Sequence, residues 1–317
     1  MITCLAGGVG AAKFVVGLSQ VIDPDTISVI VNTGDDFEMF GLYICPDMDS
    51  VTYHLAGVSN NELGWGRAQE SWAVMGAIAS LQGPDWFMLG DLDIATHLVR
   101  TEMIRSKIPL SEISKVLSKR FGIAATIVPM SDDPVRTMVR LEAGHDSSTK
   151  TRVVSFQEYF VKLKHSVSIH SVWFDGSPLA KPVPGAIEFL GASKQIVICP
   201  SNPVVSIGPI LSVAGYREVL TQKRGQVVAV SPIVGGKAIK GPADRMLTEL
   251  GHESSSLGVA RLYQDFCGTL VIDTLDQDLQ GEIENLDMKC VVANTIMDTP
   301  KKTHELADLV MKLGKTQ

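Results

Sequence analysis

Short apolar runs rich in β-branched residues alternate with longer segments of helical pattern along most of this chain of 317 residues. Such alternation is typical of a mostly parallel sheet covered by helices. We expect strands at Ile2–Leu5, Ile27–Val31, Trp86–Leu89, Gln195–Cys199, Val227–Val230, Leu270–Ile272 and Val291–Ala293. The predicted fold class is therefore α/β, with a Rossmann-like, mostly parallel sheet that carries helices on both faces.

Residues 105–184 interrupt this alternation. They contain one helical pattern, Ser111–Phe121, and then stretches in which polar and apolar residues alternate, such as Thr151–Val154 and Ser166–Phe174. Alternation with a period of two is typical of half-buried strands. We therefore expect a core made of residues 1–104 and 185–317, with a smaller inserted lobe made of residues 105–184.

The composition describes a globular protein that handles small molecules. Apolar residues make up 45% of the chain and charged residues 20%, which is enough for a full hydrophobic core and excludes disorder. The net charge is −7 and the pI is about 5.5, so no general basic field exists to bind nucleic acid. No apolar run approaches the ~20 residues needed to cross a bilayer, and no secretory leader is recognisable before the first strand.

The cysteines point to a reducing compartment. There are five of them, they are dispersed, and none forms a Cys-x-x-Cys pair. This pattern argues against both a disulfide framework and a zinc site. We expect a cytoplasmic protein without membrane contact.

Four carboxylates follow the predicted strand Ile27–Val31, in the segments Asn32–Asp36 and Cys45–Asp49. Open α/β sheets place their ligands beyond the carboxyl ends of the strands, and oxygen ligands there favour magnesium or manganese over zinc. Two solvated turns are an equally good interpretation of these segments alone, because Asp, Gly and Pro are ordinary loop residues.

The first strand leads directly into a glycine-rich turn, Gly7–Lys13. A glycine turn that opens a helix offers backbone N–H groups and a partial positive charge to an anion such as phosphate. The dinucleotide fingerprint is incomplete, because Lys13 stands where Gly or Ala is required and no acid for a ribose ends the second strand. A second turn, Ser231–Lys237, suggests a diphosphate ligand, although a flexible surface loop explains it equally well.

Two further polar segments follow predicted strands. In Gly90–Arg100, the side chains of Asp93, His97 and Arg100 would share one helix face. A lone histidine is more often a structural residue than a catalyst, so this segment needs support from others. The segment Cys199–Pro203 brackets Ser201 and Asn202 between prolines, in a stiff turn suited to hydrogen-bonding a base or a phosphate.

Taken together, these segments resemble one family over nearly the whole chain. It comprises the 2-phospho-L-lactate transferases (CofD) and their phosphoenolpyruvyl counterparts (FbiA) of coenzyme F-420 biosynthesis. The resemblance rests on Gly7–Gly10, Asn32–Asp36, Cys45–Asp49, Gly90–His97, Pro129–Pro134, Phe156–Tyr159, Pro200–Pro209 and Ser231–Ile233. One position departs from the family pattern, since Leu92 stands where an arginine is frequent.

The resemblance implies a phosphoryl transfer. The terminal ribityl hydroxyl of the deazaflavin Fo would attack the phosphorus nearer the three-carbon acid of a guanosine diphospho-lactate or diphospho-enolpyruvate, and GMP would leave. Such transfers require alignment, a metal and a base for the hydroxyl. The core would then bind the nucleotide and the deazaflavin.

Site residues follow from the same resemblance. Asp35, Asp36 and Asp49 would hold Mg²⁺ near the hydroxyl, and one carboxylate would accept its proton. The deazaflavin side would be lined by Asp91, Asp93, Thr96, His97 and Arg100. The guanylate and diphosphate would contact Gly8, Gly10, Lys13, Ser201, Asn202, Pro203 and Ser206.

Alternatives and open points accompany this interpretation. A sugar-nucleotide-binding regulator of the gluconeogenesis-factor type would share the glycine turn and the Asn-Pro loop, and a nicotinamide oxidoreductase is disfavoured by Lys13. The sequence leaves open whether the donor carries lactate, enolpyruvate or glycerate. The family suggests a homodimer. We expect Asp49→Ala to abolish turnover and to leave the fold intact.

Overall fold

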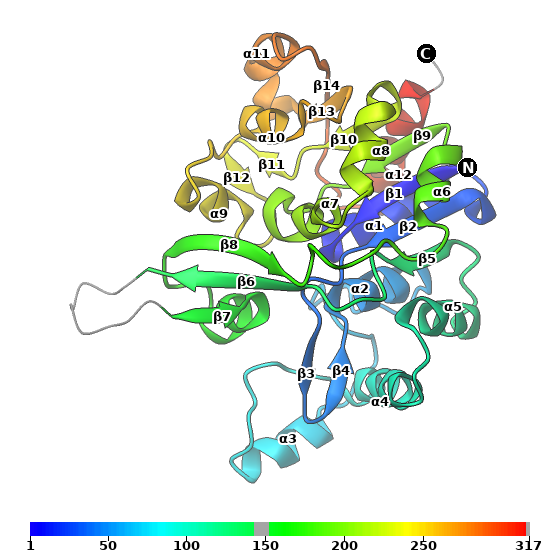
Figure 1. Cartoon of the computed structure of the whole chain (residues 1–317), viewed down its shortest axis with the longest axis vertical. Helices are drawn as coiled ribbons and strands as arrows, with labels where there is room; N and C mark the ends of the chain where they lie inside the picture. The colour runs from blue at the N-terminus through cyan, green and yellow to red at the C-terminus, as the bar shows by residue number, and fades with distance from the viewer. Residues whose placement is uncertain (143–151, 315–317) are drawn as a thin grey trace.

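The computed structural model describes residues 1–142 and 152–314, and a parallel seven-stranded sheet forms its centre (Figure 1). The strand order is β14-β13-β10-β9-β1-β2-β5. The bounds are Lys289–Ala293 for β14, Thr269–Asp273 for β13, Val227–Val230 for β10, Gln195–Ile198 for β9, Ile2–Ala6 for β1, Ile27–Val31 for β2 and Thr126–Pro129 for β5. The predicted α/β class is confirmed.

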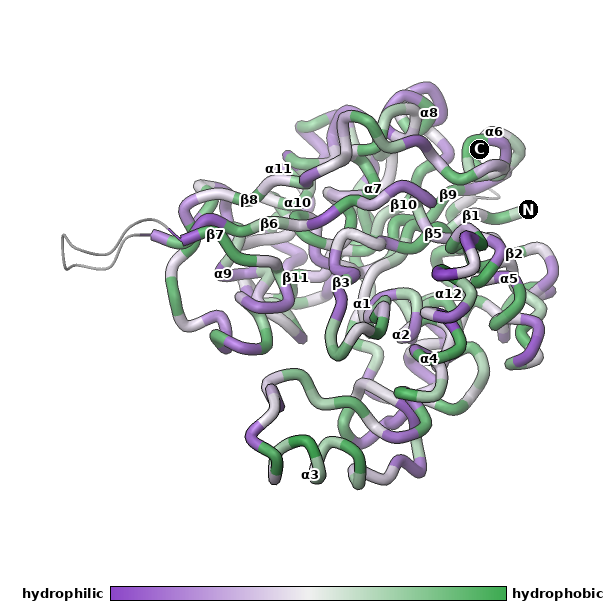
Figure 2. The backbone as a smooth tube through the Cα atoms, turned by 60° about the horizontal axis from the view of Figure 1, so that its bottom comes forward, coloured by the Kyte–Doolittle hydropathy of each residue, from purple (hydrophilic) through white to green (hydrophobic). Residues whose placement is uncertain are grey.

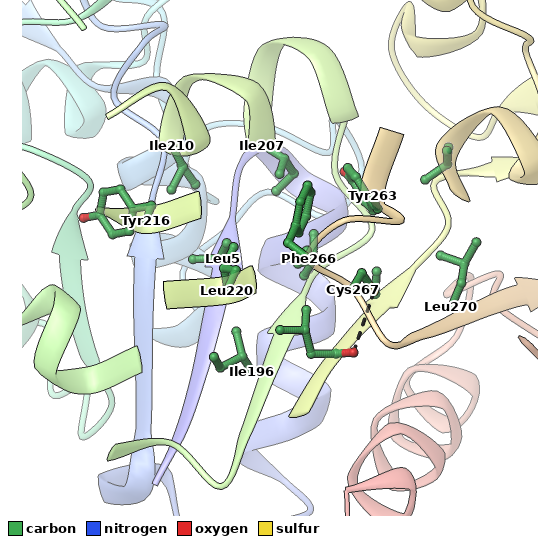
Figure 3. Packing of buried hydrophobic residues seen from close by; sticks show 14 of the residues in the cluster. Leu5, Ile196, Ile207, Ile210, Tyr216, Leu220, Tyr263, Phe266, Cys267 and Leu270 are labelled. Carbon is green, nitrogen blue, oxygen red and sulfur yellow. Dashed lines mark hydrogen bonds between the residues drawn. The ribbon is translucent and has the colours of Figure 1, made fainter. Parts of the chain in front are cut away.

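Both faces of the sheet are covered, because successive side chains of the central strands point into opposite core layers. Leu5 and Ile30 lie in the layer shown in Figure 3, and Cys4 and Val29 lie in the other. Helices of the first layer are α6 (Ala186–Ala192), α7 (Gly208–Ser212), α8 (Tyr216–Gln222), α10 (Ser256–Tyr263) and α11 (Gln280–Glu284). Helices of the second are α1 (Gly8–Ser19), α2 (Pro46–Leu55) and α12 (Pro300–Leu313).

A separate three-stranded antiparallel sheet lies within the region predicted as a lobe. Its order is β7-β6-β8, with β7 at Val153–Ser155, β6 at Arg136–Leu141 and β8 at Ile169–Asp175, and Met246 of α9 (Ala243–Glu249) packs in its core. Of the alternating stretch Thr151–Val154 noted in the sequence, Thr151 lies outside the described residues. Helix α5 (Leu110–Arg120) leads into β5, which pairs with β2 of the main sheet. The division into core and lobe remains a prediction, and the separate sheet begins only at Arg136.

The strand predicted at Trp86–Leu89 is wrong. These residues have no strand pairing, and Leu89 instead packs with Met39 and Met75 in a small cluster of its own. That cluster joins the hairpin β3 (Phe37–Met39) and β4 (Leu42–Ile44) to helix α3 (Ala73–Ser80). The apolar run is therefore buried by side-chain packing, and β5 takes the place in the sheet beside β2.

Helix α3 is mostly apolar in sequence, although most of its residues are not buried (Figure 2). Met75 is its one buried residue, whereas Val74 is 42% and the following Leu81 is 82% exposed. Exposed apolar residues gathered on one element often mark a contact surface.

The chain reverses direction across the sheet between β1 and β9. From β1 it proceeds through β2 to β5, then returns to β9 on the other side of β1 and continues outward to β14. In open α/β sheets, ligands bind beyond the carboxyl ends of the strands at such a switch point. The segments that follow β1, β2 and β9 should therefore form the site.

Candidate active site

The glycine turn after β1 packs tightly against the loop after β9. The N–H of Gly7 donates to Ser201 Oγ at 3.2 Å, and the Ser201 hydroxyl donates to the Gly7 carbonyl at 2.9 Å. A Cβ added to Gly10 would stand 2.5 Å from the Pro200 carbonyl oxygen, and Gly8 has φ of +71°. Glycine is thus required because the two loops approach closely and because the chain turns in the left-handed region.

Asp47 and Asn32 join this turn to the acidic segments. The Asn32 amide donates to Asp47 Oδ2 at 2.8 Å and to the Val205 carbonyl at 3.2 Å, while the Gly34 N–H donates to Asn32 Oδ1 at 2.8 Å. Burial raises the pKa of Asp47 to about 6, although the hydrogen bonds from Asn32 and the Gly8 backbone lower it. Asp47 stands in the first turn of α2, and its carboxylate lies against the start of α1, where an anion is favoured.

Asp35 and Asp36 are buried with too few partners. Oδ1 of Asp35 and both oxygens of Asp36 have no hydrogen bond of good geometry within the described residues, although the Cys45 thiol approaches Asp36 closely enough to lower its pKa. Burial and the charges of Asp47 and Asp36 raise the pKa of Asp35. Burial raises the pKa of Asp36 to about 7, against the opposing charges of Arg136 and Arg100. Buried unpaired carboxylates are rare in proteins, since ionised groups are costly to desolvate.

Asp49 is paired with Arg100 of α4 (Asp91–Arg105). Nη1 of Arg100 donates to Asp49 Oδ2 at 3.0 Å, and Nη2 donates to Asp49 Oδ1. The contact is a bidentate fork between two side chains that are 6% and 2% exposed. Because the pair is buried, removing Asp49 would leave an uncompensated guanidinium, so the expectation that Asp49→Ala leaves the fold intact needs revision.

His97 and Asp93 extend this pair toward Tyr53. His97 Nδ1 lies 3.1 Å from Arg100 Nη1, and a guanidinium can only donate, so Nδ1 accepts and Nε2 carries the proton. Nε2 lies 3.4 Å from Asp93 Oδ1, which also accepts a hydrogen bond of 2.6 Å from the Tyr53 hydroxyl. Burial opposes ionisation of Asp93, yet the contacts with His97 and Tyr53 prevail and lower its pKa. The predicted shared face of Asp93, His97 and Arg100 is confirmed.

Two further residues predicted on the deazaflavin side, Asp91 and Thr96, are hydrogen-bonded within the protein. The Asp91 carboxylate accepts from the Ser71 hydroxyl and from the Val74 N–H at 3.2 Å, so it caps the start of α3. Thr96 is buried, and its hydroxyl lies 3.4 Å from the Leu92 carbonyl. Glu70 instead meets the start of α4, accepting from the N–H groups of Leu92 and Asp93 at 2.6 and 2.8 Å.

Several residues predicted to bind the nucleotide shape the loop after β9 and its contact with the glycine turn after β1. The Asn202 side chain accepts from the N–H groups of Val204 and Val205, and so begins the turn Pro203–Ile207. Ser206 is buried against Gly7. Lys13 is exposed on α1. Burial lowers the pKa of Lys240 and of His54, and the charge of Lys13 lowers both pKa values further. Lys13 therefore lies within electrostatic reach of Lys240 and of His54 on α2.

The comparisons with known proteins agree on one family. The family model described as 2-phospho-L-lactate transferase CofD matches residues 2–305. The chain belongs to this family. It is 42% identical over 316 residues to the phosphoenolpyruvate transferase of Streptomyces griseus, covering 99% of this chain and 98% of that one. It is 40% identical over 317 residues to the phosphoenolpyruvate transferase of Kitasatospora aureofaciens, with the same coverage. As a member of this family, the chain is a transferase.

Solved structures support the fold. A crystal structure of a UPF0052 family member from Bacillus halodurans has a TM-score of 0.65 with this chain, at 14% identity, and each chain is covered to 98%. At this identity the likeness concerns the fold alone. No helix in the described part of the chain has both the length and the apolar character needed to span a membrane.

Among the described residues the site has one compact donor group for a metal ion, and two further buried carboxylates lie in the turn after β2. Ligand atoms of Asp49, Asp93 and His97 all lie within 4.8 Å of one another, so this buried group could bind a metal. Asp35 and Asp36 contribute carboxylate oxygens without hydrogen-bond partners, and these need a cation more than the Arg100-paired oxygens of Asp49 do. Carboxylate oxygens are the ligand type that magnesium prefers, so these residues fit such an ion chemically.

Sequence reasoning missed three residues of this site. Tyr53 follows Asp49 by four residues on α2, so a helix-face argument would have found it. Arg136 and Thr137 come from β6 of the separate sheet, and the Thr137 N–H donates to the Gly34 carbonyl at 2.7 Å. No local pattern signals that approach, since it depends on how the small sheet docks.

Proposed function

We propose that this protein transfers a phospho-enolpyruvyl or phospho-lactyl group from a guanosine diphospho donor to the ribityl hydroxyl of the deazaflavin Fo, in coenzyme F-420 biosynthesis. The observation that carries the proposal is the full-length family match over a site of clustered, buried carboxylates at the switch point. The curated relatives named phosphoenolpyruvate transferase favour the enolpyruvyl donor. No comparable observation favours a sugar-nucleotide-binding regulator.

In the proposed reaction the ribityl oxygen forms a bond to the phosphorus nearer the three-carbon acid. The bond from that phosphorus to the bridging oxygen breaks, and GMP leaves with the bridging electrons. A carboxylate of the acidic group accepts the hydroxyl proton. This chemistry requires alignment and charge stabilisation rather than a covalent intermediate.

We propose Asp35, Asp36 and Asp49 as the residues that hold Mg²⁺. When bound, the ion would screen the charge that develops on the transferred phosphoryl oxygens. The fixed tautomer of His97 and its contact with Arg100 give His97 a positioning role, because both ring nitrogens face protein groups. Arg100 in turn holds the carboxylate of Asp49.

The substrate assignments follow the two halves of the site. Asp91, Asp93, Thr96, His97 and Arg100 on α4 would line the deazaflavin side. Backbone groups of Gly8 and Gly10, together with Lys13, Ser201, Asn202, Pro203 and Ser206, would meet the guanylate and the diphosphate. Ser201 and Asn202 act there mainly by shaping the loop, since their side chains are already hydrogen-bonded within the protein.

The remaining expectations also belong to this proposal. The apolar surface of α3 supports a homodimer in which a second copy covers it, which size-exclusion chromatography with light scattering would test. All five cysteines are free and buried, in keeping with a reducing, cytoplasmic location.

The direct test is a transfer assay. Purified protein is incubated with Fo, MgCl₂ and, in parallel, the guanosine diphospho derivatives of enolpyruvate, lactate and glycerate. The expected result is a phosphodiester of Fo, detected by deazaflavin fluorescence after chromatography, with one GMP released per product. Absence of product and of GMP with all three donors would refute the proposed function.

A further inference from the structure

Arg136 reaches the acidic group from a different sheet. It is the first residue of β6, and its neighbour Thr137 hydrogen-bonds through its backbone to Gly34, in the turn that carries Asp35 and Asp36. Figure 1 shows β6 starting beside the upper end of the β3–β4 hairpin. The separate sheet thus delivers one cation to the edge of the site.

Two hydrogen bonds hold the guanidinium of Arg136 in place, but they occupy only some of its N–H donors. Nη1 donates to the carbonyl of Val135 at 2.8 Å, and Nη2 donates to the Tyr43 hydroxyl at 2.9 Å. Its central carbon lies 5.5 Å from the centre of the Tyr43 ring. A guanidinium has five N–H donors, and Arg136 uses two of them in these hydrogen bonds, while its charge acts on the nearby Asp36 carboxylate. Donors therefore remain for a ligand.

Arg100 differs from Arg136 in this respect. Both of its terminal nitrogens are committed to Asp49, and the side chain is 2% exposed. Arg136 is half-buried, at the boundary between the acidic group and solvent. Of these two arginines, Arg136 alone can exchange a water contact for a substrate contact.

The donor's three-carbon acid creates a need for such a cation. Its carboxylate must enter a site lined by Asp35, Asp36, Asp47 and Asp49, which would repel it. A planar guanidinium with free N–H groups matches a carboxylate in a bidentate fork. On the basis of the proposed function, we infer that Arg136 binds the carboxylate of the three-carbon acid and makes the enzyme select donors that carry one.

This role would give a function to the contact between the three-stranded sheet and the acidic turn. The Tyr43 hydroxyl and the Val135 carbonyl fix the guanidinium plane, so little rotamer freedom is lost when the acid binds. The same contact would serve lactate, enolpyruvate and glycerate, because all three have the carboxylate. Choice among them would rest on other residues.

The test compares two donors in four proteins. One donor is guanosine diphospho-enolpyruvate or diphospho-lactate, and the other is the guanosine diphosphate ethyl ester, which lacks the carboxylate. The proteins are the wild type, Arg136→Gln, Arg136→Lys and the control Arg140→Gln. Arg140 lies on the same strand, is exposed and also stands over an aromatic ring, Trp173.

The measured quantity is the ratio of kcat/KM for the acid donor to that for the ethyl donor, with the Kd of each donor determined by calorimetry without Fo. We expect Arg136→Gln to lower the ratio about 10- to 100-fold, as for loss of a charge-assisted hydrogen bond, and to leave the KM for Fo unchanged. Arg136→Lys should restore part of the ratio, and Arg140→Gln should match the wild type.

An equal loss with both donors, or an unchanged ratio in folded Arg136→Gln, would overturn the inference while leaving the proposed function standing. The wild type failing to use either donor would overturn both. Thermal melts of all four proteins establish that the compared variants are folded.

Discussion

Asp36→Asn should make the metal-free protein more stable at alkaline pH, although it removes a residue of the proposed metal site. Burial raises the pKa of Asp36 from 3.8 to about 7, against the charge of Arg136 and a weak contact with the Cys45 thiol, and neither carboxylate oxygen has a hydrogen bond of good geometry among the described side chains and backbone. A folded-state pKa above the unfolded value means that the folded protein holds the proton more tightly. Its contribution to stability is therefore complete below about pH 4 and is lost as the pH rises through 7.

The size of the effect follows from the shift. About three pKa units at ~1.4 kcal/mol each give ~4 kcal/mol of strain on ionised Asp36. Asparagine removes the charge but leaves an amide that lacks partners, which costs about 1–3 kcal/mol. Asp36→Asn should therefore gain about 1–3 kcal/mol at pH 8, and this advantage should shrink by about 3 kcal/mol at pH 5.

Urea unfolding in EDTA at pH 5 and pH 8 measures both values. The matched control is Asp93→Asn, because the contacts of Asp93 with His97 and Tyr53 lower its pKa. Stability from a lowered pKa is present above the unfolded value, so Asp93→Asn should destabilise the protein at pH 8. An Asp36→Asn variant less stable than the wild type by the same amount at both pH values would refute the reasoning.

Three further predictions concern the same group of side chains. Asp49→Ala should abolish turnover and lower the unfolding free energy by about 3–5 kcal/mol, since it strands the buried Arg100 guanidinium; a loss under 1 kcal/mol in denaturant titrations would contradict this. Tyr53→Phe should reduce kcat about 10-fold, because Asp93 loses its hydrogen bond from the Tyr53 hydroxyl. The control Tyr159→Phe should behave as the wild type in the same assay, because the buried Tyr159 hydroxyl has no hydrogen-bond partner among the described residues. Mg²⁺ should raise the Tm more at pH 8 than at pH 5, because protonated carboxylates bind it poorly, and equal shifts in melting curves would argue against a carboxylate site.

Much of the main sheet could be predicted from sequence because local pattern determines it. The run Val227–Val230 is continuously apolar and Ile27–Val31 is apolar except for Ser28, as is typical of parallel strands buried on both faces, and both form strands with those bounds. The run Trp86–Leu89 is equally apolar but packs beside α3, and the pattern alone does not distinguish the two outcomes.

The site was only partly predictable from residues that follow strands: Asp35 and Asp36 follow β2, whereas His97 and Arg100 follow Trp86–Leu89, which is not a strand. Asp35, Asp36, Asp49, His97 and Arg100 lie in one electrostatically connected group, as the motif positions suggested. The ion pair between Asp49 and Arg100 was not foreseen, because it joins two helices whose packing the sequence does not reveal. The approach of Arg136 was missed for the same reason, since it depends on contacts between sheets.

The central claim is that Asp35, Asp36 and Asp49 converge on one bound cation. Anomalous diffraction from crystals soaked in MnCl₂ tests it most directly. We predict a single anomalous peak at ~2.1 Å from carboxylate oxygens of the acidic turn after β2 and of Asp49. A peak confined to Asp93 and His97, or no peak near these acids at saturating Mn²⁺, would contradict the account.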